Sequence, residues 1–415
     1  EVKVMRKDGG VFDARMYVSP LVDSRGHQTG WMTSMTNITE AKRIRDQLSA
    51  SHERFTTVLE GLDAAVSVLS AVEGLTTVEA RMAPFVIPIA LTLLIALFLL
   101  QKRGTGTIGK LFAPIMLTYF TTLAVLGLIH IVDNPGVLAA LNPWYAVQFF
   151  ITDKWLAFLA LGSVVLAVTG AEALYSDMGH FGRGPLRIGW FGFVMPCLLL
   201  NYFGQAAMIM NLEAAAAAEA IKNPFFVMAS ESFRLPLVLL ATCATFIASQ
   251  AVITGAFSVT QQAIQLGFVP RLSILHTSET QHGQIYIPFV NWTLMIAVIL
   301  LVLTFRNSSN LASAYGIAVT GAMLIDTCLM AVLFLAVWRW KLWMALPLVG
   351  LFFLVDGSFF AANLPKVPDG GWFPLVIGGV VFTLLTTWKR GRAVLMDKLS
   401  ADALPLREFI DSICI

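Results

Sequence analysis

One carboxylate stands out because it falls within a long apolar stretch of the sequence. Glu172 follows Thr169, Gly170 and Ala171 at the end of the run SVVLAV. A carboxylate inside hydrocarbon costs roughly 2.5–3.5 kcal/mol on insertion scales, so it needs a partner or a water-filled cavity. Gly170 would permit the backbone to open here, which would turn carbonyl groups toward an ion. We therefore predict that Glu172 carries a proton or faces a cation; the alternative is a structural carboxylate bonded to a neighbouring helix.

Further polar groups lie on either side of Glu172. The hydroxyl of Thr169 suits a hard monovalent cation, although threonine often bonds the backbone of its own helix. Tyr175 could face the same path or anchor the chain at the membrane interface. Asp177 and His180 lie in the segment SDMGHFGRG. They could gate the path or cap a loop, and a lone histidine only weakly indicates a metal.

Two more acidic residues lie within later apolar runs. Asp326 and Asp356 are both costly in an apolar environment. Each could be a proton-relay residue or a hydrogen-bond partner between two helices. We include both among the candidate ion-binding or proton-coupling residues.

Other kinds of chemistry find little support in the sequence. We find no phosphate loop, nucleophile triad or metal-ligand cluster, and GTGTIG at 104–109 lacks the strand and helix that a nucleotide-binding loop requires. The four cysteines lie far apart, which favours packing roles. The net charge of +2 has no basic footprint for nucleic acid. We predict no enzyme activity, no cofactor, no metal and no nucleic-acid partner.

Residues 1 to about 60 differ in character from the rest of the chain. The stretches Val2–Met5, Val11–Val22 and Gly30–Ile38 alternate or carry β-forming residues and are separated by turn signals, which predicts three short strands. A charged helical stretch follows from Thr39 to Glu60. The sequence GWMTSMTNITEAKRIRDQL resembles the PAC portion of a PAS domain. The resemblance implies a small α/β fragment, about half a PAS domain, over residues 1–64.

The composition of the whole chain predicts an all-α polytopic membrane protein. Hydrophobic residues make up 57% of the sequence and charged residues 13%. Long apolar runs recur, each near the roughly 20 residues that a helix needs to cross about 30 Å of hydrocarbon. The nine predicted spans lie near 83–101, 111–132, 155–175, 186–208, 233–255, 288–305, 311–338, 342–362 and 372–388.

The distribution of basic residues predicts the orientation of the chain. One alternate set of loops holds thirteen Lys and Arg residues and the opposite set six, which places the C-terminus in the cytoplasm. Nine crossings would then place the PAS-like segment outside, although such segments belong in the cytoplasm. We expect residues 62–75 to be too short to cross, at about 20 Å of helix. The two halves of the chain thus predict different topologies.

Several long strings resemble the Kup/HAK/KT family of potassium uptake permeases. The resemblance begins at AVSVLSAVEGL (65–75), near the end of the third helix of that family, and continues to about residue 411. Its most specific strings are QKRGTGTIGKLFAPIML (101–117), VTGAEALYSDMGHFGRGPLRIGWF (168–191), VTQQAIQLGFVPRLSILHTSETQHGQIYIPFVNW (259–292) and AYGIAVTG (314–321). We expect residues 65–411 to form a potassium transporter membrane domain.

The resemblance implies both a fold and an activity. The fold would be the inverted-repeat fold of LeuT-like transporters in the APC superfamily, in the bacterial inner membrane. The activity would be potassium uptake by K+/H+ symport, with K+ as the transported ion and H+ as the coupling ion. A homodimer is a further assembly to consider.

The sequence also departs from the family pattern. It lacks the first two helices of the family, including a Gly-Asp-Ile-Gly-Thr type motif, so we expect an N-terminally truncated permease with an incomplete ion site and poor transport. Two alternatives stay open. One is a PAS-linked membrane sensor, which bound heme or flavin would favour, and the other is an amino-acid permease of the same superfold.

Overall fold

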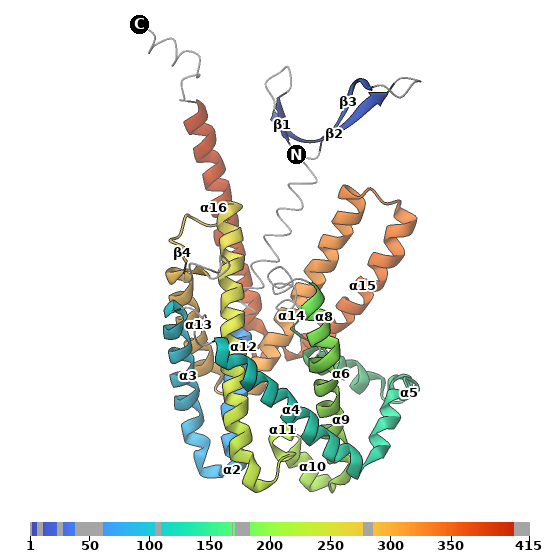
Figure 1. Cartoon of the computed structure of the whole chain (residues 1–415), viewed down its shortest axis with the longest axis vertical. Coiled ribbons are helices and arrows are strands. Elements are labelled where there is room, and N and C mark those ends of the chain that lie inside the picture. Colours follow the sequence, from blue (N-terminus) through green and yellow to red (C-terminus); the bar gives the residue numbers. More distant parts are fainter. Residues whose placement is uncertain are drawn as a thin grey trace.

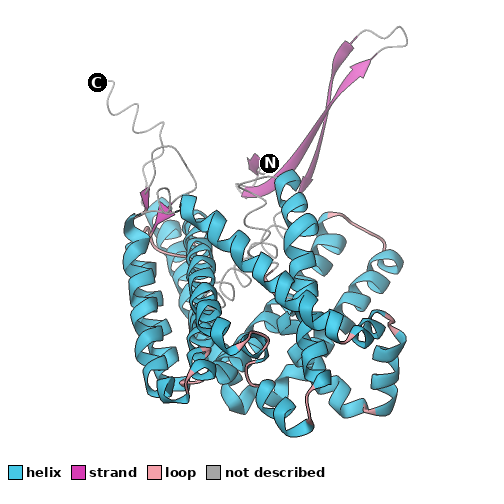
Figure 2. Ribbon diagram, turned by 60° about the horizontal axis from the view of Figure 1, so that its bottom comes forward, coloured by secondary structure: helices cyan, strands magenta, loops and turns pink. Residues whose placement is uncertain are grey.

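The computed structural model describes residues 2–5, 11–22, 28–37, 61–103, 109–167, 169–170, 183–276 and 285–401. Over these residues the chain forms a three-stranded sheet and a body of packed helices, from which the strands extend at one end (Figure 1, Figure 2).

The sheet contains the three predicted strands. β1 (Val2–Met5), β2 (Val11–Val22) and β3 (Gln28–Asn37) pair in chain order, and both pairs are antiparallel. The strand prediction is therefore confirmed. The charged helix predicted over residues 39–60 lies outside the described residues, and the PAS identity stays a prediction.

The helical body contains helices of very different lengths. A helix through residues 61–73 comes first. It is followed by α2 (Leu75–Val78), α3 (Val86–Leu100), α4 (Gly109–Asp133), α5 (Trp144–Thr152), α6 (Lys154–Ala167), α8 (Arg183–Gly189), α9 (Met195–Asn211), α10 (Ala214–Ala220), α11 (Pro224–Val227), α12 (Glu231–Gln265), α13 (Pro288–Phe305), α14 (Ser308–Val332), α15 (Leu342–Asn363) and α16 (Trp372–Ala401). A two-stranded hairpin, β4 (Leu275–His276) with β5 (Ile285–Tyr286), lies between α12 and α13.

Eight stretches of the described chain are long and apolar enough to cross a membrane. The prediction of an all-α polytopic membrane domain is thus confirmed. The predicted spans 342–362 and 372–388 form one apolar stretch, Leu342–Met396, which contains α15 and α16. The predicted span 155–175 is described as the shorter helix α6, which ends at Ala167.

The first apolar stretch corrects the expectation that residues 62–75 are too short to cross. By length and composition, Gly61–Val78 qualifies as a membrane span. The prediction ended the stretch at residue 75, which made it about 20 Å long, whereas the helical residues continue through α2 to Val78. The carboxylate of Glu73, which lies within this stretch, has partners on another helix.

Glu73 caps the N-terminus of α14. It accepts hydrogen bonds from the backbone nitrogen of Ser308, at 2.9 Å, and from the Ser308 hydroxyl. A carboxylate at this place compensates the unpaired N–H groups and the positive end of the helix dipole. Four residues later, the carbonyl of Thr77 accepts from Arg234 Nη1 near the start of α12, at 3.3 Å. The helix at 61–78 is thereby tied to both α14 and α12.

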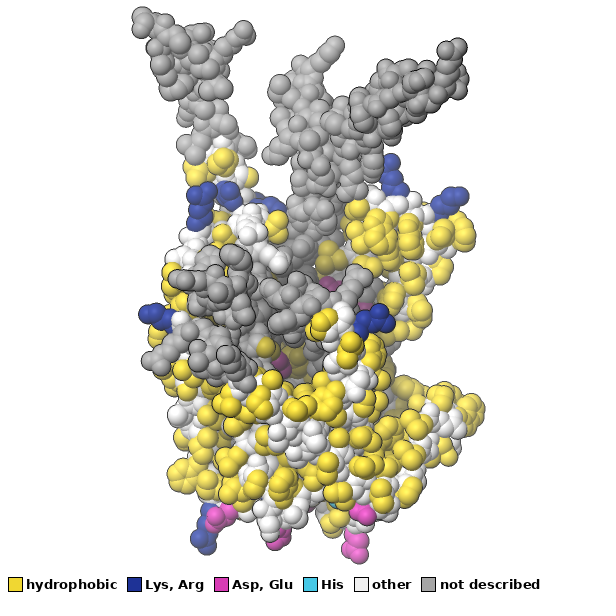
Figure 3. Space-filling view, in the orientation of Figure 1, with side chains coloured by type: hydrophobic (Ala, Val, Ile, Leu, Met, Phe, Trp, Pro, Cys, Tyr) yellow, Lys and Arg dark blue, Asp and Glu magenta, His cyan; other side chains and the backbone are white. Residues whose placement is uncertain are grey.

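The main hydrophobic core surrounds this first helix. Leu62 and Leu69 are fully buried, and they belong to one cluster with Leu94 of α3, Val298 of α13 and Leu311 of α14. By contrast, large hydrophobic side chains are exposed along the outer faces of α4, α5, α15 and α16. Figure 3 shows this apolar surface, with acidic side chains gathered at the lower end and most visible Lys and Arg side chains nearer the other end. Such a distribution fits a bilayer as the solvent.

Two glycines allow α4 and α9 to pack at close range. A Cβ atom built on Gly127 would lie 2.2 Å from the carbonyl oxygen of Leu200, and one on Gly204 would lie 2.4 Å from the Cα of Gly127. Both distances are far below ordinary van der Waals contact. The contact therefore requires glycine on both helices, as in close helix pairs within membranes.

We predict that Gly127→Ala lowers the thermal unfolding midpoint of the purified protein in detergent, because overpacking typically costs about 1–3 kcal/mol. Tryptophan fluorescence would measure the transition. The matched control is Gly350→Ala in α15, where a new Cβ has no atom within 4 Å and the substitution should be neutral or stabilising. Equal midpoints for the two variants would show that the glycine contact does not hold α4 to α9.

Candidate functional site

The helical backbone changes direction directly after α6. α6 ends at Ala167, and Gly170 adopts a φ of +104°, which favours glycine. Thr169 donates its hydroxyl to the carbonyl of Leu166, at 2.9 Å. This is the self-capping bond that the sequence left open as the alternative to ion binding. The Thr169 oxygen keeps its acceptor lone pairs, so the bond does not prevent it from facing a cation.

Four predicted site residues lie outside the described residues. These are Glu172, Tyr175, Asp177 and His180, all within 171–182. Their roles stay predictions from the sequence. The structure describes the chain on both sides of this segment, with α6 before it and α8 after it.

Asp356 is a buried carboxylate between two helices. It lies on α15 with 8% of its surface exposed, and it accepts a hydrogen bond from the hydroxyl of Thr327 on α14, which is equally buried. Asp326, the residue before Thr327, is only partly buried. The bond between Thr327 and Asp356 agrees with one of the two alternatives predicted for Asp356, a hydrogen-bond partner between two helices.

The helices that carry these residues pack against one another. Gly316 of α14 lies against Asn363 at the end of α15, while Thr327 meets Asp356 further along both helices. Residue numbers rise on α14 as they fall on α15, so the two helices are antiparallel. Gly162 of α6 also lies against Asn363. Asp326 and Asp356 therefore lie on two helices, α14 and α15, that pack with α6, and Thr169 follows α6 by two residues.

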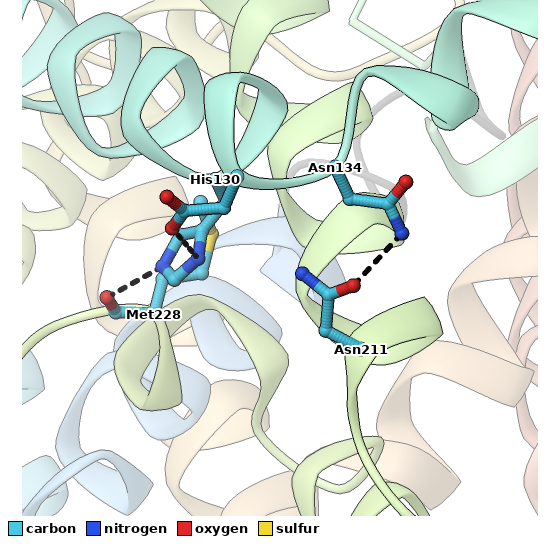
Figure 4. A network of polar contacts seen from close by, with 5 residues as sticks. His130, Asn134, Asn211 and Met228 are labelled. Carbon is cyan, nitrogen blue, oxygen red and sulfur yellow. Dashed lines mark hydrogen bonds and ion pairs between the residues drawn. The ribbon is translucent and has the colours of Figure 1, made fainter.

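A second polar cluster, which sequence reasoning did not single out, joins α4 to α9 and α11. Figure 4 shows it: His130 Nε2 lies 2.9 Å from the carbonyl oxygen of Met228, and its Nδ1 lies 4.0 Å from the carboxylate of Asp133. Asn134 donates to the side chain of Asn211 at 2.9 Å. The signal in the sequence was a group of polar residues at the end of an apolar run. These contacts join α4 to α9 at one end of the two helices.

The β4–β5 hairpin is held by an aromatic contact. Tyr286 packs edge-on against Phe257 of α12, with ring centroids 5.7 Å apart. Burial raises the pKa of the Tyr286 phenol, and a hydrogen bond with the Asn291 side chain opposes this shift. The neutral phenol is therefore the form that supports this packing.

Among the residues that the structure describes, no group of three or more His, Cys, Asp or Glu side chains could hold a metal ion.

The fold and these intramembrane polar groups define a polytopic helical membrane protein with buried carboxyl groups. Residues 61–393 match the family described as the K+ potassium transporter integral membrane domain, and the chain belongs to this family. The family consists of membrane permeases rather than enzymes.

Curated relatives agree with the family match. The chain is 69% identical over 348 residues to a probable potassium transport system protein Kup from Erythrobacter litoralis, which covers 84% of this chain and 56% of the relative. It is 56% identical over 349 residues to the protein of the same name from Zymomonas mobilis, with 84% and 53% coverage. The chain thus spans about half the length of the curated relatives it matches. Neither the sensor nor the amino-acid permease hypothesis finds support among them.

We predict that Thr327→Val destabilises the protein by about 1–3 kcal/mol, because the Asp356 carboxylate would stay buried without its donor. Thermal unfolding in detergent would measure the change. Thr327→Ser keeps the hydroxyl and is the matched control, so it should lose much less stability. If Thr327→Val were as stable as the parent chain, the hydrogen bond to Asp356 would not contribute to stability.

Proposed function

We propose that this chain moves potassium ions across the bacterial inner membrane by symport with protons, as a Kup-type secondary permease. Support comes from the family match and from relatives whose printed names describe potassium transport. Further support comes from a general property of transporters with interrupted helices, in which cations bind where backbone carbonyls are freed from helical pairing.

The observation that carries the proposal is the interruption after α6. A helix end leaves its last carbonyl groups without intrahelical partners. Here the end lies between apolar helices, and Gly170 turns the chain out of helical geometry. The carbonyls of Leu166 and Ala167 accept hydrogen bonds from the side-chain hydroxyls of Thr169 and Tyr202. The segment that follows contains Glu172, so hydroxyl, carbonyl and carboxylate oxygens come close together along the chain. Carbonyl, hydroxyl and carboxylate oxygens together suit a monovalent alkali cation.

In this proposal, each candidate residue has a definite role. Glu172 and Thr169 line the ion path, with Tyr175 beside them, while Asp177 and His180 gate the side toward α8. Asp326 and Asp356 belong to the route of the coupling proton. These assignments rest on residue type and on position in the sequence, and for Asp326 and Asp356 also on their positions in α14 and α15.

The relative depth of Thr169 and Asp356 fits a shared path. Thr169 follows Gly162 by seven residues, and Asp356 precedes Asn363 by seven residues. Gly162 and Asn363 are in contact. If α6 and α15 cross in opposite directions, both residues lie about 10 Å along their helices from that contact, at about 1.5 Å per residue. The two oxygens would then lie at the same level of the membrane.

The proposed topology follows from the additional span at Gly61–Val78. The nine predicted spans count α6 as one crossing and Leu342–Met396 as two; with Gly61–Val78 added they make ten, and an even number places the N-terminal sheet and the C-terminus on the same side of the membrane. The excess of Lys and Arg assigns that side to the cytoplasm. A PAS-like fragment would then lie in the cytoplasm, and the topological conflict disappears. The LeuT-like fold and a homodimeric assembly stay predictions from the sequence.

We predict that the chain gives measurable but weak rubidium uptake and growth at low potassium in a bacterium without its own potassium uptake systems, in line with the poor transport expected from the sequence, and that Glu172→Gln abolishes both. The amide keeps the shape of the side chain but removes its charge and its proton. Uptake of radioactive rubidium would be normalised to the amount of protein in the membrane.

The matched control is Glu219→Gln. Glu219 is an exposed carboxylate that pairs with Lys222 on the surface, at 2.7 Å, so its loss should leave uptake unchanged. The proposal fails if membranes containing the chain take up no more rubidium than membranes without it. The assignment of Glu172 fails if the Gln variant transports like the parent chain.

A further inference from the structure

A small cluster holds α6 against its two neighbours. We call it the α6 collar, and it consists of Gly162 on α6, Gly316 on α14, and Asn363 and Lys366 at the end of α15. Lys366 lies in the short helical turn Leu364–Lys366 that leaves α15. Its Nζ donates to the carbonyl of Gly162 at 3.0 Å. These two residues are 204 positions apart in the sequence.

The two glycines of the collar make room for one side-chain oxygen. A Cβ on Gly162 would lie 2.9 Å from Asn363 Oδ1 and 3.0 Å from the carbonyl oxygen of Ala362. A Cβ on Gly316 would lie 3.1 Å from the same Oδ1. The Asn363 amide oxygen therefore sits between the backbones of α6 and α14, where only glycine fits without movement.

Asn363 is fully buried, and only the nitrogen of its side-chain amide has a hydrogen-bond partner among the described residues. Its Nδ2 donates to the carbonyl of Phe359, at 3.0 Å. Its Oδ1 has no hydrogen-bond donor among the described residues. The oxygen can make weak Cα–H contacts with the two glycines, which are second-order interactions. Asn201 and Asn291 also have a buried side-chain oxygen without a described partner, so what distinguishes Asn363 is its place between the two glycines.

The collar connects directly to the interruption after α6. Leu166, one turn after Gly162 on the same face, places its side chain 3.5 Å from the Cβ position of Gly316. The carbonyl of Leu166 accepts the hydroxyl of Thr169, and Gly170 follows. A rotation or shift of α6 at Gly162 would thus be transmitted through less than three helical turns to Thr169.

We propose that Lys366 and Asn363 are positioning residues for ion transport: they fix the end of α6 so that Thr169 faces the ion path. This inference rests on the proposed transport function. Lys366 acts on the ion indirectly, by adding a second, charge-assisted donor to a carbonyl of the helix that ends at the path. Asn363 acts as a spacer that sets how closely α6 approaches α14.

The first test separates positioning from a purely structural role through the kinetics of rubidium uptake. Lys366→Met keeps the length of the side chain but removes the donor, and it should raise the KM about five- to tenfold with little change in Vmax. Lys366→Arg keeps a donor and should restore the KM to within about twofold. Lys222→Met is the matched control, because Lys222 is an exposed lysine paired only with Glu219 in the described chain.

Different outcomes would overturn the inference. If Lys366→Met lowers Vmax and leaves the KM unchanged, Lys366 affects only the amount of folded protein. If Lys366→Arg behaves like Lys366→Met, hydrogen bonding to Gly162 is not what matters. If Lys222→Met raises the KM equally, the effect comes from loss of positive charge on the protein in general.

The second test needs no transport, so it distinguishes failure of the inference from failure of the proposed function. Thr169→Cys is introduced into a variant of the chain in which serine replaces each native cysteine. The rate at which this new cysteine reacts with a soluble maleimide is then measured in membranes. Both Lys366→Met and Gly162→Ala should change this rate several-fold, while Lys222→Met should not. Unchanged rates in the collar variants would overturn the inference even if the chain transports rubidium.

Asn363→Ala provides a check on the spacer role. It removes the oxygen that a methyl group at residue 162 would meet, so Gly162→Ala should have a smaller effect on the labelling rate in the Asn363→Ala background. Independent, additive effects would show that the two residues do not act through one contact.

Discussion

The absence of water inside a bilayer constrains this protein more than any single contact. Polar groups at that depth must find their partners within the protein. In the described helices, threonine hydroxyls bond carbonyls of their own helix, as Thr242 does with Val238 and Thr260 with Ala256. Charged or strongly polar groups are matched between helices, as Glu73 is with Ser308. At the end of α6 the partners are side-chain hydroxyls, those of Thr169 and Tyr202, which donate to the carbonyls of Leu166 and Ala167.

Much of the fold followed from the sequence, for a simple reason. The same hydrocarbon that demands internal pairing also demands about 20 apolar residues per crossing, and this length is visible in a single sequence. The strands at 2–5 and 11–22 were equally visible, because alternation and turn residues are local signals. The span at Gly61–Val78 was missed because the prediction ended it at residue 75, and because it contains the carboxylate of Glu73. Its partner, Ser308, is 235 residues away.

The candidate site was less predictable than the fold. The sequence located Thr169 and Asp356 as costly or oxygen-bearing residues in apolar runs, and the structure places them on packed helices. It could not indicate Lys366, which looked like an ordinary loop lysine, or Asn363, whose burial depends on two glycines on other helices. Pairings of this kind join residues that lie far apart in the sequence, and local hydropathy carries no information about them.

The manner of packing distinguishes helices that move together from helices that can move separately. α4 and α9 meet backbone to backbone at Gly127 and Gly204, which leaves no slack between them. α6 meets α15 in a similar way at Gly162, where a Cβ would lie 3.0 Å from the carbonyl oxygen of Ala362, and Lys366 adds a hydrogen bond to the carbonyl of Gly162. Backbones packed at such range are stiff. In a transport mechanism, α4 with α9 and α6 with α15 would therefore each act as one rigid unit, and displacement would fall on contacts between helices that lack such glycines.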